Sequence, residues 1–418
     1  MTSTLPPPSS YRQVLTTRHV GPLLAGAVIA HLPVAMAPLA ILLSVRSNGG
    51  SLSTAGLLAA IYGLTAAISQ PIWGRLLDRR GHRPALIIPT FGSTLGFAAL
   101  LLTEPVMRPE LAVMATTLAG ACTQPTEAAL RILWPHLLER DADQRKALAI
   151  DACAQELVFI AGPVAVLLAD SAGGPSLALA ATAAAGIAGS TLFLSATPAS
   201  RTVHTNKGAS DWIGPLRAPA PRTLVAALFG TGVALGAINV VALASAERHD
   251  TEYLSTLMPA ALAVGSLTGG LVYGQRGWTS PPGTQLLVAA GGILAALVPL
   301  LADPTPGLAL PAALLPGLFL APLLIIAFQA LGHLTPPAML GEASAWLIAA
   351  LGLGQAAGTA LAGRAVAWGD QMPLLVALGG AAWTCGLLAP HRNEFAPPNA
   401  YRQRRRQPAK GQRDRAAQ

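Results

Sequence analysis

Long apolar runs recur along the chain and are separated by short polar segments. Each run has about 20 residues, the length that a helix needs to cross a hydrocarbon core of about 30 Å. Backbone groups in lipid must bond within their own segment, so these runs predict helices. The pattern predicts an all-α membrane protein with twelve transmembrane helices, at residues 20–45, 52–73, 85–102, 111–130, 148–168, 177–196, 224–244, 254–273, 285–301, 308–331, 343–366 and 372–388.

The longest polar interruption falls between the sixth and seventh runs and contains four prolines. Proline-rich polar stretches are typical of linkers. We therefore expect an N-terminal six-helix bundle at 1–196, a cytoplasmic linker at 197–222, a C-terminal six-helix bundle at 223–390 and a disordered basic cytoplasmic tail at 391–418.

Basic residues lie on one side of this topology. With the N-terminus inside, all but four of the 27 lysines and arginines fall on inner segments, and the exceptions are Arg46, Arg108, Arg248 and Arg364. Inner loops of membrane proteins carry this excess. The pattern predicts a multi-pass protein of the cell inner (plasma) membrane with both termini in the cytoplasm.

Composition agrees with a lipid environment, because 52% of residues are hydrophobic and only 11% are charged. Six of the eight net positive charges lie in the tail after residue 390. A basic tail beside hydrophobic segments favours contact with anionic lipid over nucleic acid, especially with Tyr401 as its one aromatic residue for stacking bases.

The loop after the second predicted helix reads Gly74-Arg75-Leu76-Leu77-Asp78-Arg79-Arg80-Gly81-His82-Arg83-Pro84. It resembles the signature loop of the major facilitator superfamily, G-x-L-x-D-R-x-G-R-R, and His82 is the clear departure. Without the resemblance, a positive-inside loop with a helix stop explains the arginines but leaves the embedded Asp78 unexplained.

The resemblance implies a conformational gate on the inner face of a two-bundle transporter. Its predicted members are Gly74, Asp78, Arg79, Gly81, Arg83 and Arg131. Asp78 is expected to bridge to Arg131 at the inner end of the fourth helix and to face the start of the eleventh. Such a latch should favour the outward-facing state. The run from Leu130 to Pro163 is similar to an actinobacterial branch of the superfamily, and resemblance to drug/proton antiporters is weak.

The second half contains an echo of this loop at an offset of 196 residues. Gly74, Arg80 and Gly81 correspond to Gly270, Arg276 and Gly277, while Asp78 is replaced by Gly274. Together with the six-plus-six pattern, the echo favours two similar bundles around a central path, with substrate bound near the midplane.

Polar side chains inside the predicted helices are the candidates for proton coupling or substrate binding, because a charged group at this depth is costly unless it pairs or faces a cavity. They are His31, Glu156, Asp151, Gln155, Asn239 and Gln329. Glu156 is the first candidate for a coupling carboxylate. For His31 a proton or substrate role and a neutral hydrogen bond to a neighbouring helix are equally open.

Two further expectations concern charge pairs near the inner face. Asp151 is expected to reach toward the inner interface or to offset Arg145 and Lys146. Glu127 and Arg131 are four residues apart and are expected to neutralise each other.

No ATP-binding loop or H-E-x-x-H zinc pair occurs in the sequence, and three cysteines do not suggest a disulfide framework. We therefore expect no enzyme activity, cofactor or metal, and a monomer in the lipid bilayer that takes energy from a gradient. The function predicted is proton-coupled efflux of a drug-like or metabolite small molecule by alternating access. A metabolite importer or facilitator is the alternative, and a non-transporting receptor or scaffold is the third.

Overall fold

The computed structural model describes residues 10–103, 107–198, 214–251, 253–369 and 371–395, and within these ranges the chain folds into helices and turns. The α-helices are α1 (Tyr11–Thr16), α2 (Val20–Ser47), α3 (Leu52–Arg80), α4 (His82–Leu102), α5 (Pro109–Ala121), α6 (Thr126–Leu137), α7 (Asp141–Ala196), α8 (Pro219–Arg248), α9 (Leu254–Gln275), α10 (Pro282–Leu297), α11 (Pro306–Leu334), α12 (Leu340–Ala365) and α13 (Met372–His391). Short 3-10 helices are η1 (Pro215–Arg217), η2 (Val298–Ala302), η3 (Pro337–Met339) and η4 (Val366–Trp368).

These helices account for twelve crossings. In the described part of the chain, ten helical stretches are long and apolar enough to cross a membrane. One of them, α7, has 56 residues and holds two crossings. The remaining crossing is shared by α5 and α6, which have 13 and 12 residues. The predicted all-α fold of twelve membrane helices in two bundles is confirmed.

The fourth crossing is broken, so the expectation of one helix over 111–130 is wrong. Pro125 lies between α5 and α6, has no backbone N–H and cannot extend α5. Non-helical backbone at membrane depth requires burial in protein, and Gln124 in this break is buried. Trp73 Nε1 donates to the Ala121 carbonyl at 2.7 Å and so satisfies one free group at the end of α5.

Helix α7 reverses direction at two glycines. Gly173 has a non-helical φ of −158°, and Gly174 has a φ of +73°, which glycine adopts without steric cost. After the turn, Gly186 and Gly189 lie against Pro33 and Ala30 of α2, so this arm runs antiparallel to α2. The two crossings of α7 therefore form a hairpin, in agreement with the break predicted between 168 and 177.

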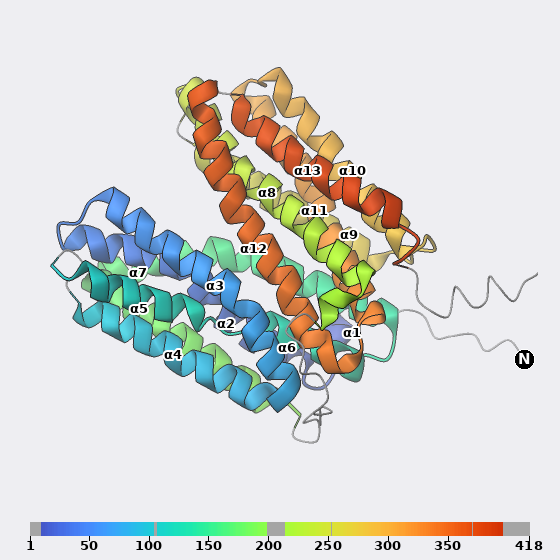
Figure 1. The fold of residues 1–418 in the computed structure, drawn as a ribbon, viewed down its shortest axis with the longest axis horizontal. Coiled ribbons are helices and arrows are strands. Elements are labelled where there is room, and N and C mark those ends of the chain that lie inside the picture. Colours follow the sequence, from blue (N-terminus) through green and yellow to red (C-terminus); the bar gives the residue numbers. More distant parts are fainter. Residues whose placement is uncertain (1–9, 104–106, 199–213, 252, 370, 396–418) are drawn as a thin grey trace, which may run out of the picture.

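Helices α2–α7 form one bundle and α8–α13 form the other (Figure 1). We call the side where the described chain begins and ends the terminus face, and it also holds the turns α3–α4, α6–α7 and α9–α10. The opposite side, with the turns α2–α3 and α12–α13, is the distal face. The linker and the tail fall largely on residues 199–213 and 396–418, outside the described ranges, so the predicted domain limits stay predictions.

The two bundles converge at the terminus face. Gly74, Gly63 and Gly56 share one side of α3, because steps of 11 and 7 residues are close to whole turns. A Cβ added at Gly74 would lie 2.6 Å from the Ala345 Cβ and 2.7 Å from the Gly341 oxygen of α12. At Gly63 or Gly56 it would meet nothing within 4 Å. Helices α3 and α12 are thus close at one end and diverge toward the other, as the ribbons show (Figure 1).

Candidate functional site

The end of α3 places a carboxylate on the start of α12. Asp78 is 7% exposed and accepts hydrogen bonds from the backbone N–H groups of Gly341 at 2.9 Å and Glu342 at 2.7 Å. Amides in the first turn have no partner within their own helix, and the positive end of the helix dipole favours an anion there. Asp78 therefore caps a helix of the opposite bundle, and the expected contact with the start of the eleventh span is present.

An ion pair lies beside this cap. Arg75 donates from Nε to Glu342 Oε2 at 3.1 Å and from Nη2 to Glu342 Oε1 at 2.7 Å. This two-point geometry makes a guanidinium–carboxylate pair stronger and more specific. Gly74 allows the two backbones to approach closely enough for both interactions. We call the contacts of Gly74, Arg75 and Asp78 with the start of α12 the α3–α12 tie.

Arg131 is not part of this tie, and the expected bridge between Asp78 and Arg131 is wrong. Arg131 instead pairs with Glu127 and Asp151. The two oxygens of Asp78 are occupied by amides of α12. The helix cap therefore takes the role that the resemblance implies for an arginine.

The remaining loop residues shape the turn from α3 to α4. Gly81 has a φ of +80° and ends α3, while Arg79 and Arg83 are exposed at the terminus face. Their gating role stays a prediction. Arg75 was missing from the predicted gate, although it lies three residues before Asp78 and therefore on the same side of the helix.

A second set of contacts joins the bundles through backbone carbonyls at the end of α9. The bonds are Tyr11 Oη to Leu271 O at 2.7 Å, Arg145 Nη1 to Arg276 O at 3.0 Å and Cys153 Sγ to Leu267 O at 3.6 Å. Burial, with a smaller effect of Cys153, raises the pKa of Tyr11 to about 12, so its hydroxyl remains a donor at neutral pH. We call these contacts the α7–α9 tie.

The two ties involve the segments that the repeat relates. A Cβ added at Gly274, the counterpart of Asp78, would lie 2.8 Å from the Ala149 Cβ of α7. One added at Gly270, the counterpart of Gly74, would lie 3.8 Å from the Cys153 sulfur. The end of α9 thus meets the opposite bundle as the end of α3 does, but without a carboxylate.

Four ionisable side chains of the N-terminal bundle, farther from the terminus face than the ties, are linked pairwise in a row. The distances are 3.3 Å from His31 Nδ1 to Glu127 Oε1, 3.2 Å from Arg131 Nη1 to Glu127 Oε2 and 3.6 Å from Arg131 Nη2 to Asp151 Oδ2. The side chains are only 5–15% exposed. Gln155 hydrogen-bonds to both carboxylates. We call these five residues the ion cluster.

The break in the fourth crossing positions this cluster. It puts Glu127 in the first turn of α6, where free amides and the helix dipole stabilise a carboxylate. The expected Glu127–Arg131 pair is confirmed. The expectation that Asp151 offsets Arg145 and Lys146 is wrong, because Asp151 is 3% exposed and pairs with Arg131.

The cluster carries one surplus negative charge while His31 is neutral, because it has two carboxylates and one guanidinium. An uncompensated charge in a low-dielectric surrounding is costly. A proton on His31 or a bound cation would remove that cost. The cluster is therefore suited to hold one additional positive charge.

Arg131 also connects the cluster to the other bundle. Its guanidinium carbon lies 3.4 Å from the centroid of the Phe328 ring on α11. Such a cation–π contact contributes about 0.5 to 2 kcal/mol. A change of charge at Glu127 or Asp151 therefore acts on a residue that contacts both halves.

The other predicted polar residues lie apart from the cluster. Glu156 hydrogen-bonds to Ser266 of α9, across the bundle interface. Asn239 is exposed on α8. Gln329 donates to the Asp141 carbonyl at 3.3 Å at the terminus face.

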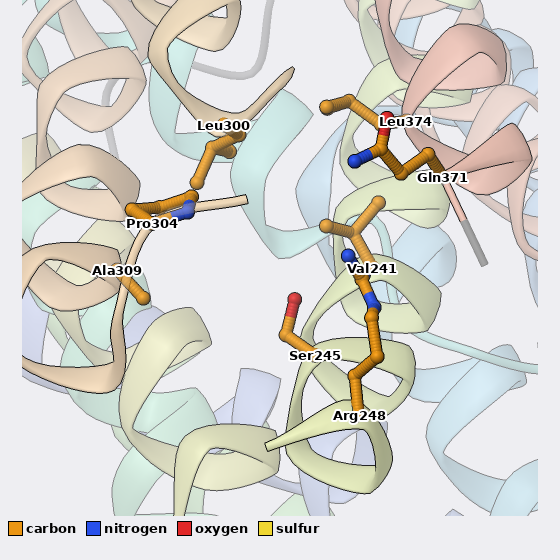
Figure 2. A pocket seen from close by; sticks show the side chains of 8 residues that line it. All are labelled: Val241, Ser245, Arg248, Leu300, Pro304, Ala309, Gln371 and Leu374. Carbon is orange, nitrogen blue, oxygen red and sulfur yellow. The ribbon is translucent and has the colours of Figure 1, made fainter. Parts of the chain in front are cut away.

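A small cavity lies within the C-terminal bundle near the distal face, between the ends of α8 and η2 and the starts of α11 and α13 (Figure 2). Its volume of about 10 Å³ has room for one water molecule at most. Beside it, Asp303 lies 2.5 Å from Arg248 and 3.3 Å from His249. The ion pairs of Asp303 connect turns of a single bundle, and the cavity is too small to hold a solute.

Two six-helix bundles that meet at one face, with a charged cluster at their interface, define a polytopic membrane protein of the two-bundle transporter class. The chain belongs to the Major Facilitator Superfamily, whose model matches residues 23–359. It is therefore a transporter whose substrate is not yet known. A sequence comparison with curated proteins finds no match.

Solved structures share the fold. The human organic anion transporter MFSD10 (TETRAN) has a TM-score of 0.69 at 16% identity, covering 91% of this chain and 100% of its own. The Escherichia coli fucose:proton symporter FucP has 0.68 at 15%, covering 89% and 98%. A bacterial homologue of the iron transporter ferroportin, in an outward-facing state, has 0.70 at 15%, covering 89% and 99%. At such low identities the likeness shows the fold alone.

Proposed function

We propose that this chain exports a small cationic or lipophilic solute by alternating access, in exchange for protons, with the terminus face in the cytoplasm of the plasma membrane. The observation that carries the proposal is the ion cluster, in which two carboxylates share one guanidinium and a histidine beside the bundle interface. The excess of basic residues on the terminus-face loops supports this orientation.

Exchange follows from competition for one charge. A proton and a cationic solute both neutralise the cluster, and binding of either makes binding of the other unfavourable. Under an inward proton gradient, protons entering from outside would displace solute that has reached the distal face. The proton is then released inside when the next solute molecule binds.

The two ties supply the gate in this scheme. In the described structure both are formed, so the terminus face is closed. When the cluster is neutralised, Arg131 is held less tightly by Glu127 and its contact with Phe328 changes. The bundles can then rock, breaking the ties and opening the terminus face.

The test is flux in proteoliposomes under an imposed pH gradient, using compounds that stabilise the purified protein against heat. We expect Glu127→Gln to lower pH-driven flux at least tenfold, because the variant has lost the surplus negative charge for which a proton and the solute compete. Glu156→Gln is the matched comparison, since Glu156 is a buried acid outside the cluster. Loss of coupling in Glu156→Gln alone would move the proton site to Glu156, and unchanged coupling in both variants would overturn the proposal.

The same assay separates the other functions. A metabolite importer or facilitator would accumulate solute in whole cells and show no pH-driven counterflow. A receptor or scaffold would bind a compound without any flux. Each result would leave the family assignment intact and remove the proposed exchange.

A further inference from the structure

A groove opens on the outer side of the C-terminal bundle near the terminus face, between α9, α10 and α11. It encloses about 290 Å³. Its walls are mostly apolar and include Val272, Val288, Phe319 and Ile326. Val288 is 63% exposed and Val272 is 45% exposed, so the groove faces the space that lipid occupies around a membrane helix.

The groove has a definite depth and polarity. Along α9 it extends from Arg276 to Thr268, eight residues or about 12 Å of helix. Except for Thr268 at the deep end, its polar residues gather at the shallow end, where the α9–α10 turn leaves the membrane. An apolar channel with a polar mouth at the interface matches the form of a lipid, with its acyl chain inside and its headgroup at the mouth.

Three of the neutral side chains at the mouth, those of Tyr273, Trp278 and Gln285, are hydrogen-bonded within the protein. Trp278 stacks on Tyr273 with ring centroids 5.1 Å apart, and its Nε1 donates to the Tyr273 carbonyl at 3.0 Å. The Tyr273 hydroxyl donates to Gln285 Oε1, and Gln285 Nε2 donates to Ser280 O at 2.5 Å. These bonds orient the aromatic pair at the mouth, so a headgroup would be recognised mainly through charge, beside the hydroxyls of Ser280 and Thr284.

The charge at the mouth is positive and comes from both bundles. Arg276 of α9 is exposed, and Arg145 of α7 donates to the Arg276 carbonyl at 3.0 Å. Arg145 also acts electrostatically on Tyr273, which lines the groove. In the part of the chain that the structure describes, no carboxylate pairs with either arginine.

We propose that this groove is a binding site for an anionic phospholipid of the terminus-face leaflet. One acyl chain lies along Val272, Val288 and Phe319, and the phosphate is held between Arg276 and Arg145. Because these arginines belong to different bundles, the bound headgroup reinforces the α7–α9 tie and favours closure of the terminus face. The site does not depend on the proposed proton exchange.

The test uses full-length protein in detergent, with phosphatidylglycerol or phosphatidylcholine of identical chains added, and native mass spectrometry of the bound lipid. We expect phosphatidylglycerol to bind more tightly. Arg276→Gln and Arg145→Gln should each reduce the preference of the protein for phosphatidylglycerol over phosphatidylcholine about fivefold. This is the effect expected from the loss of one basic residue near a membrane surface. Val288→Trp, which fills the groove from an exposed position, should weaken binding of both lipids.

Arg80→Gln is the matched control. Arg80 is the repeat counterpart of Arg276, is exposed at the same face and lies on α3, away from the groove. It should leave lipid preference unchanged. Equal binding of the two lipids, equal effects of Arg80→Gln and Arg276→Gln, or occupancy by neutral lipophilic compounds without headgroup preference would each overturn the proposal. Thermal unfolding of every variant confirms that it is folded.

Discussion

The two ties join the same bundles at the same face, but they do so with different chemistry. The α3–α12 tie consists of a carboxylate on two helix amides and a two-point ion pair. The α7–α9 tie uses hydroxyl, guanidinium and thiol donors on backbone carbonyls, with no acid among these bonds. At corresponding positions of the repeat, the α3–α12 tie has Asp78 and the α7–α9 tie has Gly274.

This difference separates two mechanical roles. Hydrogen bonds to charged groups contribute about 1.5–3 kcal/mol each, whereas neutral ones contribute about 0.5–1.5 kcal/mol. The α3–α12 tie is therefore the stronger and the more sensitive to charge. The α7–α9 tie has one charged donor, Arg145, beside a neutral hydroxyl and a thiol, so it is weaker per contact, and we expect it to act as the pivot about which the stronger tie opens.

The largest effect on the closed population is expected from a larger side chain at Gly74, where α3 and α12 are closest. Gly74→Val would push a side chain against Ala345 and the Gly341 backbone, at a cost of about 3 kcal/mol, or more than a hundredfold in the closed population. Gly274→Val should cost less, because one of its two close neighbours is the flexible end of Tyr11 and the other is the Ala149 Cβ, whereas Gly74 faces a Cβ and two backbone atoms. Distances between spin labels on the exposed ends of α3 and α9 report the closed population in both variants. Equal shifts for the two variants would contradict the proposed difference between the ties.

Removing the charge of the cap should have the next largest effect. Asp78→Asn keeps the shape but loses the anion at the helix N-terminus, which should weaken the closed state by about 2 kcal/mol, or roughly thirtyfold. Cysteine labelling at the terminus face should increase in the variant. Asp78→Glu serves as the control, because it keeps the charge and should show a smaller increase.

A double-mutant cycle isolates the ion pair. Arg75→Gln and Glu342→Gln should show a coupling of about 1–2 kcal/mol in the closed population, since both side chains are largely buried. The Arg248–Asp303 pair is the matched control, because it lies within one bundle and its partners are 20% and 32% exposed. Its cycle should affect thermal stability without shifting the open and closed populations. A coupling near zero for Arg75 and Glu342 would remove the pair from the gate.

The smallest effect is expected at Tyr11. Tyr11→Phe removes one neutral hydrogen bond and should weaken closure by about 1 kcal/mol, or fivefold. Because the pKa of Tyr11 is raised above its usual value of 10 to about 12, its contribution is complete below pH 10 and is lost as pH rises toward 12. The contribution of Tyr11 should therefore be constant between pH 6 and pH 9, so any pH dependence of the label distance in that range should be the same in wild type and Tyr11→Phe. A shift within that range in wild type but not in Tyr11→Phe would contradict this account.

The fold was largely predictable because lipid makes each crossing a local problem. A run of about 20 apolar residues forms a helix whatever its neighbours are, so the spans emerged from hydropathy alone. The one misread span contains Pro125, whose effect depends on whether nearby side chains such as Trp73 satisfy the freed backbone. Asp78 stood out in a local motif, and its contact with the eleventh span was implied by the family resemblance of that motif.

The candidate site was only partly predictable. Glu127 and Arg131 are four residues apart on one helix, so their pairing was visible in the sequence. Their links to His31 and Asp151 join three different crossings and depend on how the helices are rotated. Arg75 was overlooked because its partner, Glu342, lies 267 residues away.

By itself, the sequence determined that this protein is a set of membrane helices with one basic side and a family-like signature loop after the second of them. Hydrophobic length, charge and helix periodicity act over a few residues, and these are properties of a single segment. Only the tertiary structure decided that Asp78 caps α12, that Arg131 serves the ion cluster and that the bundles close at one face. Those outcomes depend on the angle and depth at which separate helices meet, which side-chain packing across the bundles sets.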